Sequence, residues 1–279
     1  MIERSERSWL KADQAQIMGI LNITPDSFSD GGLFLSAENA AEQARRMEQE
    51  GASIIDIGGE STRPGALPVT AEQELERVIP AIRAIREHSQ IPISIDTSKP
   101  EVMREAVKAG ASLVNDVYGL RTPGALEAAV ELEVPVCIMH MQGEPRTMQA
   151  NPRYSNVVED VYRFLSERVQ AAVNAGIAKD KIIVDPGFGF GKTVEQNMAL
   201  LYGLARFRDL GCPVLIGVSR KSTLGAILDR PVDKRLAGSL AAAVLARIQG
   251  ADIIRVHDVA ETVDALKVLA AMKAIGEYT

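Results

Sequence analysis

The feature that most constrains this chain is a repeated alternation between short apolar runs and longer amphipathic stretches. The apolar runs are rich in Ile, Val and Leu and lie at residues 16–22, 53–58, 92–96, 113–117, 135–141, 181–187, 213–219 and 252–257. They are nearly continuous rather than alternating in polarity, as is typical of parallel strands that are covered on both faces. The stretches between them have helical periodicity, for example residues 37–49, 71–86 and 157–175. The alternation therefore predicts repeated β-α units.

About eight such units close into a barrel more readily than they form an open sheet, and a (β/α)₈ barrel needs roughly 250 residues. The chain has 279 residues, and neither a linker nor a low-complexity tract divides it. We therefore expect an α/β fold, a TIM (β/α)8 barrel, as a single domain over residues 1–279. An open doubly wound sheet is the alternative. Two long interruptions, at residues 23–35 and 61–70, are expected to be functional loops at the active-site end.

Charge and cysteine content exclude several classes of protein. The chain has 31 Lys and Arg against 37 Asp and Glu, a net charge of −6, which argues against a nucleic-acid binder with a basic stripe. Its two cysteines exclude a disulfide scaffold or a Cys-rich zinc site. Residues 1–15 contain no signal-peptide apolar region, and the longest run of small apolar residues, 236–246, is too short to span a bilayer. We expect a cytoplasmic protein that does not bind membranes.

Polar side chains stand at or just after the end of each apolar run. They are Asn22, Thr62, Arg63, Asp96, Asn115, His140, Asp185, Ser219, Lys221, Arg255 and His257. The carboxyl ends of barrel strands converge on one mouth, where TIM-barrel active sites lie. A single Asp there is explained equally well as a helix N-cap. A polar group at every strand end is not, so the pattern indicates a site.

The chemistry of these side chains falls into two groups. Asp96, Asn115 and Asp185 offer acceptors and an amide donor, which suit the amino-pyrimidine edge of a flat heterocycle. The cationic set, Arg63, Lys221, Arg255 and His257, suits a pyrophosphate, with a solvated rim as the simpler interpretation. The site is thus predicted to hold a nitrogen-rich heterocycle at one end and an anion at the other.

The sequence lacks three common catalytic or phosphate-binding motifs, although two segments resemble them. Gly191-Lys192-Thr193 resembles the end of a P-loop, but Pro186 occupies the position that requires the first glycine. Residues 217–221 resemble a nucleophile elbow, but the fifth position is Lys221 instead of glycine. The three histidines form no zinc-hydrolase pair.

Two long segments resemble the signatures of the dihydropteroate synthases. Residues 20–31, ILNITPDSFSDG, are similar to the first signature, and residues 51–64, GASIIDIGGESTRP, to the second. Residues 94–97, 115–116, 185–190, 219–222 and 255–258 continue the match in order. The resemblance covers nearly the whole chain. It implies an enzyme, a transferase that condenses 6-hydroxymethyl-7,8-dihydropterin pyrophosphate with p-aminobenzoate, giving 7,8-dihydropteroate and pyrophosphate in folate biosynthesis. The family is the target of sulfonamides.

The resemblance also implies roles for individual residues. The pterin site would be Asp96, Asn115, Asp185 and Lys221, of which Asp96, Asp185 and Lys221 would be catalytic. The pyrophosphate site would be Asn22, Thr62, Arg63, Arg255 and His257, with Asn22 near a Mg²⁺ ion (Mg2+). The p-aminobenzoate pocket would be Phe28, Thr62, Arg63, Pro64, Phe190, Ser219, Lys221 and Ser222. A homodimer is the usual assembly of the family. Met139 and His140 are equally well explained as a pocket wall or as hydrogen-bond partners.

Two other functions remain open from the residues. A methyltransferase of the same barrel group, which passes a methyl from a methylated folate to a corrinoid protein, would share the Asp and Asn pterin set. It would not need Arg63, Lys221 and Arg255 together, nor the loop at residues 22–30. A non-catalytic pterin-binding protein is expected to have lost an anion-site residue, and none is missing here.

Overall fold

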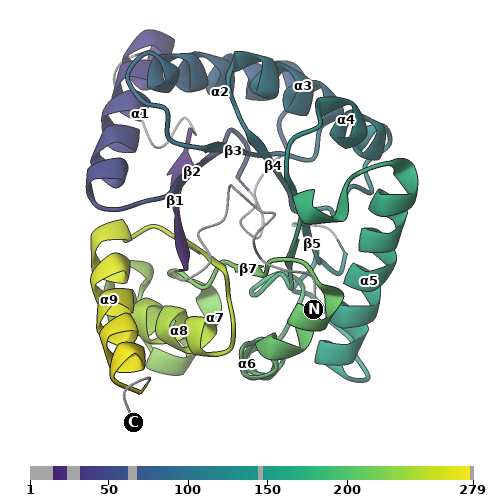
Figure 1. Cartoon of the computed structure of the whole chain (residues 1–279), viewed down its shortest axis with the longest axis vertical. Coiled ribbons are helices and arrows are strands. Elements are labelled where there is room, and N and C mark those ends of the chain that lie inside the picture. Colours follow the sequence, from purple (N-terminus) through teal and green to yellow (C-terminus); the bar gives the residue numbers. More distant parts are fainter. Residues whose placement is uncertain (1–14, 24–31, 62–67, 144–146, 277–279) are drawn as a thin grey trace.

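Eight parallel strands form a barrel inside a ring of helices in this computed structural model, which describes residues 15–23, 32–61, 68–143 and 147–276 (Figure 1). The strands are β1 (Gln16–Asn22), β2 (Ile54–Gly58), β3 (Ile93–Asp96), β4 (Leu113–Asp116), β5 (Val136–Met139), β6 (Ile182–Asp185), β7 (Leu215–Ile216) and β8 (Ile253–Val256). Each predicted apolar run contains one of them. Strand β7 is the shortest and occupies only part of the predicted 213–219.

The sheet closes on itself through two different junctions. Strand β1 pairs with both β2 and β8, and a single parallel bridge between Val184 and Val214 joins the β6 and β7 ends. The neighbour order β6-β5-β4-β3-β2-β1-β8-β7 therefore becomes a ring. The predicted TIM barrel is confirmed, and the open-sheet alternative is wrong.

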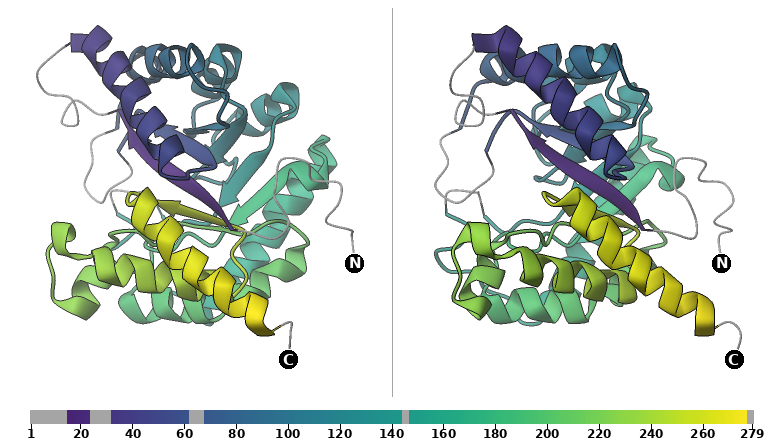
Figure 2. Two further views of the ribbon diagram at one scale, coloured as in Figure 1. Left: turned by 60° about the vertical axis from the view of Figure 1, so that its left-hand side comes forward. Right: turned by 90° about the vertical axis from the view of Figure 1, so that its left-hand side faces the viewer.

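The helices follow the strands in alternation, with shorter 3₁₀ turns among them. They are α1 (Gly32–Gln49), α2 (Ala71–Arg86), α3 (Pro100–Ala109), α4 (Ala125–Leu132), α5 (Val157–Ala175), α6 (Val194–Tyr202), α7 (Ser222–Leu228), α8 (Leu236–Ile248) and α9 (Val259–Gly276). Helix α1 begins at Gly32, so residues 32–35 of the predicted first loop are helical instead. The first and last helices lie beside each other in Figures 1 and 2. A Cβ atom added to Gly19 of β1 would contact both Met47 of α1 and Val259 of α9.

Side-chain caps decide where several helices begin. The Thr70 hydroxyl accepts from Gln73 N, and the Gln73 side chain accepts in return from Thr70 N, which starts α2. Thr193 and Gln196 form the same reciprocal pair at the start of α6. These bonds satisfy backbone donors that the first helical turn leaves unpaired. The cap at Thr193 thereby sets the start of α6 directly after residues 186–192, the segment that follows β6.

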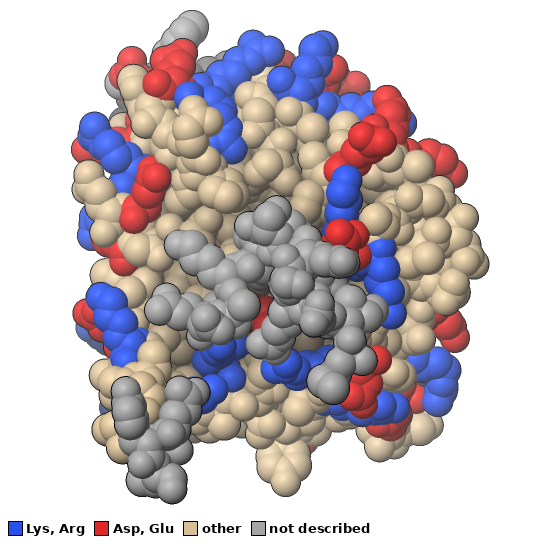
Figure 3. Space-filling model, in the orientation of Figure 1, with Lys and Arg blue, Asp and Glu red and all other residues tan. Residues whose placement is uncertain are grey.

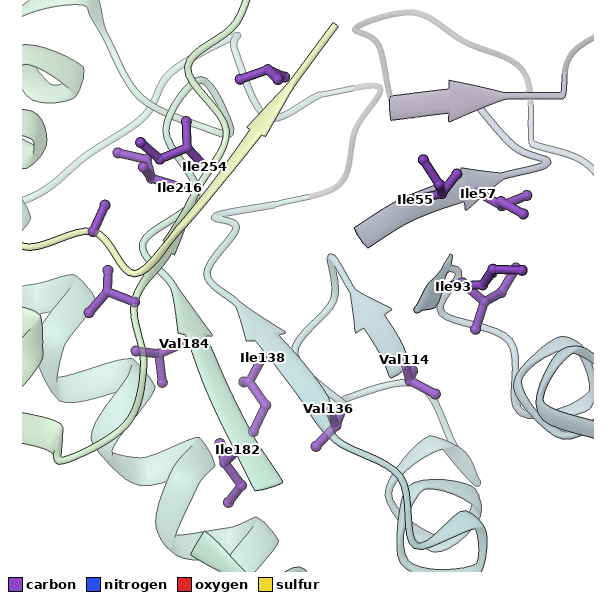
Figure 4. Close-up of a cluster of buried hydrophobic side chains, with 14 of the residues drawn as sticks. Ile55, Ile57, Ile93, Val114, Val136, Ile138, Ile182, Val184, Ile216 and Ile254 are labelled. Carbon is purple, nitrogen blue, oxygen red and sulfur yellow. The ribbon is translucent and has the colours of Figure 1, made fainter. Parts of the chain in front are cut away.

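The residues of each strand alternate between the barrel interior and the surrounding helices. Outward-facing side chains, among them Ile55, Ile57, Ile93, Val114 and Ile138, pack between the strands and the helices (Figure 4). We call the inward-facing cluster that fills the barrel the apolar layer; it consists of Met18, Ile54, Leu113, Cys137, Ile183, Leu215 and Ile253. Every member is at most 3% exposed. The barrel is thus a packed core and not a pore, as in other barrels of this type.

On the face seen in Figure 3, basic and acidic side chains are interspersed around the periphery. Strand β1 runs toward the left of both views in Figure 2, away from the face shown in Figure 3. Within the described ranges, no helix is long and apolar enough to cross a bilayer.

Candidate active site

Ionisable and amide side chains form a second layer directly above the apolar layer. We call it the polar layer; it consists of Asp56, Asp96, Asn115, Asp185 and Arg255. Each comes from a strand, so the period of two along β2, β4, β6 and β8 carries the chain from an apolar to a polar inward-facing residue. These side chains are therefore positioned by the strands of the barrel.

Arg255 links three strands across the barrel interior. Its Nε donates to Asp56 Oδ2 at 2.6 Å, and its Nη2 donates to Asp96 Oδ2 at 2.9 Å. Asn115 Nδ2 also donates to Asp56 Oδ2, at 3.3 Å. Because β8 is not a neighbour of β3 in the sheet, these contacts cross the barrel interior. The predicted residues Asp96, Asn115 and Arg255 are thus brought together in one hydrogen-bonded network.

Within the part of the chain that the structure describes, two carboxylate oxygens of this network have no hydrogen-bond partner. Oδ1 of Asp56 and Oδ1 of Asp96 are buried without a hydrogen-bond partner among the described residues. Burial raises the pKa of Asp96 to about 7, against the lowering effect of Arg255. A buried carboxylate oxygen without a partner is costly, and a ligand that donates N–H bonds would remove this cost.

Asp185 closes the other side of the polar layer. Its Oδ1 accepts from Gly187 N at 2.7 Å, and burial raises its pKa to about 6, opposed by this hydrogen bond and by Lys221. Lys221 lies just before α7, with its Nζ 4.1 Å from the centroid of the Phe190 ring. Burial and the nearby Arg255 lower the pKa of Lys221 to about 8. Asp185, Lys221 and Phe190, all predicted site residues, thus gather at one part of the mouth.

The structure changes the prediction for His257. Its Nδ1 lies 3.0 Å from Ser219 Oγ, and its backbone N donates to the same oxygen at 3.2 Å. Burial, and then Arg255 and Arg220, lower the pKa of His257 to about 4. The ring is therefore neutral near pH 7, and His257 is not a member of the cationic set unless an anion binds beside it.

Asn22 ends β1 and is close to Asp96. A Cβ atom added to Gly58 would lie 3.7 Å from Asn22 Oδ1 and 3.8 Å from Asp96 Oδ2, so both oxygens lie near the same point above this glycine. Amide and carboxylate oxygens are the ligands that Mg²⁺ prefers. Among the described residues, no group of three or more His, Cys, Asp or Glu could hold a metal ion. The donor set fits an ion that takes most of its ligands from substrate phosphates and water, as Mg²⁺ commonly does.

Several predicted site residues are not placed together by this structure. Phe28, Thr62, Arg63 and Pro64 lie outside the described residues. Ser222, the first residue of α7, is described and is exposed.

Two site residues were missed from the sequence. Asp56 lies inside the second signature but in the middle of a strand, where it is fully buried; its inward register with Ile54 and Gly58 was the available signal. Lys192 was considered only as part of a failed P-loop, yet the residue is 3% exposed and its Nζ lies 3.0 Å from His140 Nδ1. A lysine directly after three alternating glycines, at a strand-to-helix connection, was the signal there.

Comparisons with known proteins agree with this geometry. A family described as "Pterin binding enzyme" matches residues 18–257. The dihydropteroate synthase of Haemophilus influenzae is 57% identical over 92% of this chain and 93% of its own length, and that of Escherichia coli K12 is 53% identical over 94% and 93%. A Yersinia pestis dihydropteroate synthase in complex with a sulfonamide drug superimposes with a TM-score of 0.90 at 49% identity, covering 95% of this chain and 96% of that one. A Xanthomonas albilineans dihydropteroate synthase in complex with 7,8-dihydropteroate gives 0.87 at 49% identity, with the same coverage.

Proposed function

The chain belongs to the dihydropteroate synthase family, and from this premise we propose which side chains carry the reaction. That reaction joins 6-hydroxymethyl-7,8-dihydropterin pyrophosphate to p-aminobenzoate and gives 7,8-dihydropteroate and pyrophosphate. The observation that carries the assignment is the polar layer, in which Asp56 and Asp96 keep buried carboxylate oxygens without a partner among the described residues. A pterin is a flat heterocycle with amino and ring N–H donors, which would satisfy such oxygens.

The pterin is held by Asp96, Asn115, Asp185 and Lys221. Asp96 and Asp185 accept from the amino-pyrimidine edge, while Lys221 donates to the carbonyl edge. Asn115 already donates to Asp56, which leaves its amide oxygen to accept from the ligand. Arg255 holds Asp56 and Asp96 in place and presents its charge at the same mouth.

The pyrophosphate is bound by Asn22, Thr62, Arg63, Arg255 and His257. Arg side chains suit this anion because their donors match two oxygens at once. His257 offers a neutral N–H until the anion arrives, and the anion's charge then favours its protonated form. Asn22 would help to hold a Mg²⁺ ion, which would neutralise part of the charge that develops on the leaving group.

The p-aminobenzoate pocket is formed by Phe28, Thr62, Arg63, Pro64, Phe190, Ser219, Lys221 and Ser222. The Phe190 ring next to the Lys221 ammonium offers an apolar wall beside a positive charge, which suits an aromatic acid. A sulfonamide has a similar shape and charge, and the Yersinia pestis relative was solved with one. We therefore expect sulfonamides to compete for this pocket.

In the chemical step, the bond between the pterin methylene carbon and the pyrophosphate oxygen breaks before the new C–N bond forms. The positive charge that develops on the methylene spreads into the dihydropterin ring, where Asp96 and Asp185 stabilise it in a site of low dielectric. The arylamine attacks as a neutral nucleophile and then releases a proton, so the step needs no strong general base. Exclusion of water protects the cation from hydrolysis.

The assay mixes the pterin pyrophosphate, p-aminobenzoate and Mg²⁺ with the purified protein. We expect pyrophosphate release that depends on the arylamine. A corrinoid methyltransferase or a non-catalytic binder would release none, and that result would overturn the proposal.

We further propose a homodimer and a cytoplasmic location. Helices α8 and α9 expose Leu245, Ile248, Val268, Met272 and Ile275, each between 48% and 72%, and an interface with a second copy would remove such apolar side chains from water. Light scattering should give a dimer mass for the wild type and a monomer mass for Val268→Glu. Cys137 and Cys212 are buried free thiols, as is usual in a reducing compartment.

A further inference from the structure

Lys192 is a buried lysine that the reaction described above does not use. It lies between β6 and α6 and is 3% exposed. Its Nζ donates to the carbonyl oxygens of Gly187 and Phe190, both at 2.8 Å, and lies 3.0 Å from His140 Nδ1. These three acceptors match the three N–H donors of an ammonium group. Among the described carboxylates, none forms an ion pair with it, so backbone carbonyls and a ring nitrogen surround the amino group, and burial lowers its pKa to about 7.

His140 is suited to this contact. Burial and the nearby Lys192 lower the pKa of His140 to about 2, so the ring is neutral and can present Nδ1 as an acceptor. Its backbone N donates to Asp185 O at 2.9 Å, and its ring meets Phe164 edge-on with centroids 4.9 Å apart. The sequence left His140 as either a pocket wall or a hydrogen-bond partner. Its contact with Lys192 is that of a hydrogen-bond partner.

The segment that Lys192 holds follows a path that requires glycine at two positions. Gly187 and Gly191 have φ angles of +70° and +61°, a region that favours glycine. A Cβ on Gly187 would overlap the His140 carbonyl oxygen, and one on Gly191 would lie 2.6 Å from Gln142 O. The segment therefore packs backbone against backbone on residues 140–142, and Phe188 within it is buried in the core.

The two carbonyls that Lys192 binds belong to residues that set the position of proposed site groups. Gly187 N donates to Asp185 Oδ1 at 2.7 Å, and the Phe190 ring lies 4.1 Å from Lys221 Nζ. Lys192 Nζ thus contacts both Gly187, whose N–H binds Asp185, and Phe190, whose ring packs against Lys221. Lys192 acts on both through the backbone of residues 187–190.

We propose that Lys192 is a positioning residue for pterin binding, which holds segment 187–190 so that Asp185 and Lys221 face the ligand together. The proposal rests on the proposed function, because that function assigns Asp185 and Lys221 to the pterin. A lysine that only stabilised the fold would contribute to the free energy of unfolding without changing the affinity of the folded protein.

The experiment compares Lys192→Met with the wild type by isothermal titration calorimetry, using 6-hydroxymethylpterin as the probe. Met has a similar length but no donors, so both carbonyls lose the Lys192 donor, and Gly187 O keeps only its bond from Phe190 N. We expect the dissociation constant to rise about tenfold or more, since small displacements of binding groups have effects of this size. The control is Ile85→Ala, which removes a buried side chain of α2 away from the site. It should lower the unfolding midpoint and leave the dissociation constant unchanged.

A second pair of variants tests the same idea if Lys192→Met does not fold. His140→Gln keeps an acceptor near the ammonium, and His140→Leu removes it. We expect His140→Leu to bind the pterin more weakly than His140→Gln. Equal binding by these two, or wild-type affinity in Lys192→Met, would overturn the positioning role alone. Failure of the wild type to bind the pterin would overturn the proposed function instead, and this inference with it.

Discussion

The apolar layer and the polar layer share strands β2, β4, β6 and β8, where their residues lie two positions apart, yet they have opposite chemistry. On β2, β6 and β8 the sequence steps from Ile54 to Asp56, from Ile183 to Asp185 and from Ile253 to Arg255. The lower residue of each pair fills the barrel, and the upper one carries a charge. Because the apolar layer admits no water from below, the charges above it are desolvated on that side.

This difference explains the electrostatics of the mouth. Burial raises the pKa of Asp96 and of Asp185, and lowers the pKa of Lys221 and of His257. The same loss of solvent strengthens every interaction with a charged ligand. The apolar layer thus contributes to function through the dielectric environment it gives to the polar layer, although its side chains carry no reactive groups.

The largest effect should come from removing the shared cation of the polar layer. Arg255→Met leaves Asp56 and Asp96 buried without their counter-ion, which should lower the free energy of unfolding by about 3–5 kcal/mol and weaken pyrophosphate binding. Urea unfolding and calorimetry measure the two effects. The double variant Asp56→Asn with Arg255→Met should recover part of the stability, since one uncompensated charge is gone. Wild-type stability in Arg255→Met would show that the ion pairs are not needed.

A cavity in the apolar layer should affect stability almost as much, but not the chemistry. Leu215 is fully buried, and Leu215→Ala should lower the free energy of unfolding by about 3 kcal/mol, from lost burial and an unfilled cavity. We expect kcat to remain close to that of the wild type. A large loss of kcat in a variant that remains folded would contradict the division of labour between the two layers.

Neutralising one carboxylate of the polar layer should lower kcat much more than the stability of the fold. Asp96→Asn keeps the shape but removes the charge, so kcat should fall about 100-fold, equivalent to about 2.7 kcal/mol. Pyrophosphate affinity should change much less. Steady-state kinetics and product binding distinguish the two, and an unchanged kcat would exclude the electrostatic role of Asp96.

The smallest effect is a pH dependence that has opposite signs for stability and for catalysis. The folded pKa of Asp96 is about 7 and that of Asp185 about 6, against an ordinary aspartate value of 3.8. Folding therefore favours their protonated forms. The stability they contribute is fully present below about pH 4 and is lost as the pH rises through their folded pKa values. Catalysis needs the ionised forms, so kcat should fall as the pH drops below about 7.

Urea unfolding of the wild type and of Asp96→Asn, between about pH 5 and pH 8, measures this dependence. The wild type should lose stability more steeply with rising pH, by at most about 1.4 kcal/mol per pH unit for one proton. Equal slopes for the two proteins would mean that Asp96 does not take up a proton on folding.

The sequence alone predicted the barrel and most of the described site. Nearly continuous apolar runs predicted buried parallel strands, and polar residues at their ends predicted a mouth containing Asp96, Asn115, Asp185 and Arg255. This worked because the direction of a parallel strand brings all the carboxyl ends to one side. The local sequence at each strand end therefore indicated which residues from distant parts of the chain meet at the mouth.

The same reasoning failed where a role depends on contact partners. Asp56 and Arg255 are 199 residues apart in the sequence, and only barrel closure makes one the counter-ion of the other. Burial and neighbours from other elements lower the pKa of His257 to about 4, which disfavours the positive charge expected for it near pH 7. Lys192 was assigned to no site because its role depends on the residues that it contacts, and the sequence does not show those contacts.

The amino-acid sequence by itself determined that this chain folds into a β/α barrel of the dihydropteroate synthase family, and which residues end its strands. Periodicity and motif spacing are local properties, and they can be read without coordinates. The tertiary structure decided which of those residues form an ion pair or a hydrogen bond with one another. Desolvation and ion pairing depend on atoms a few ångströms away in space, and closure of the barrel brings those atoms together from distant parts of the chain.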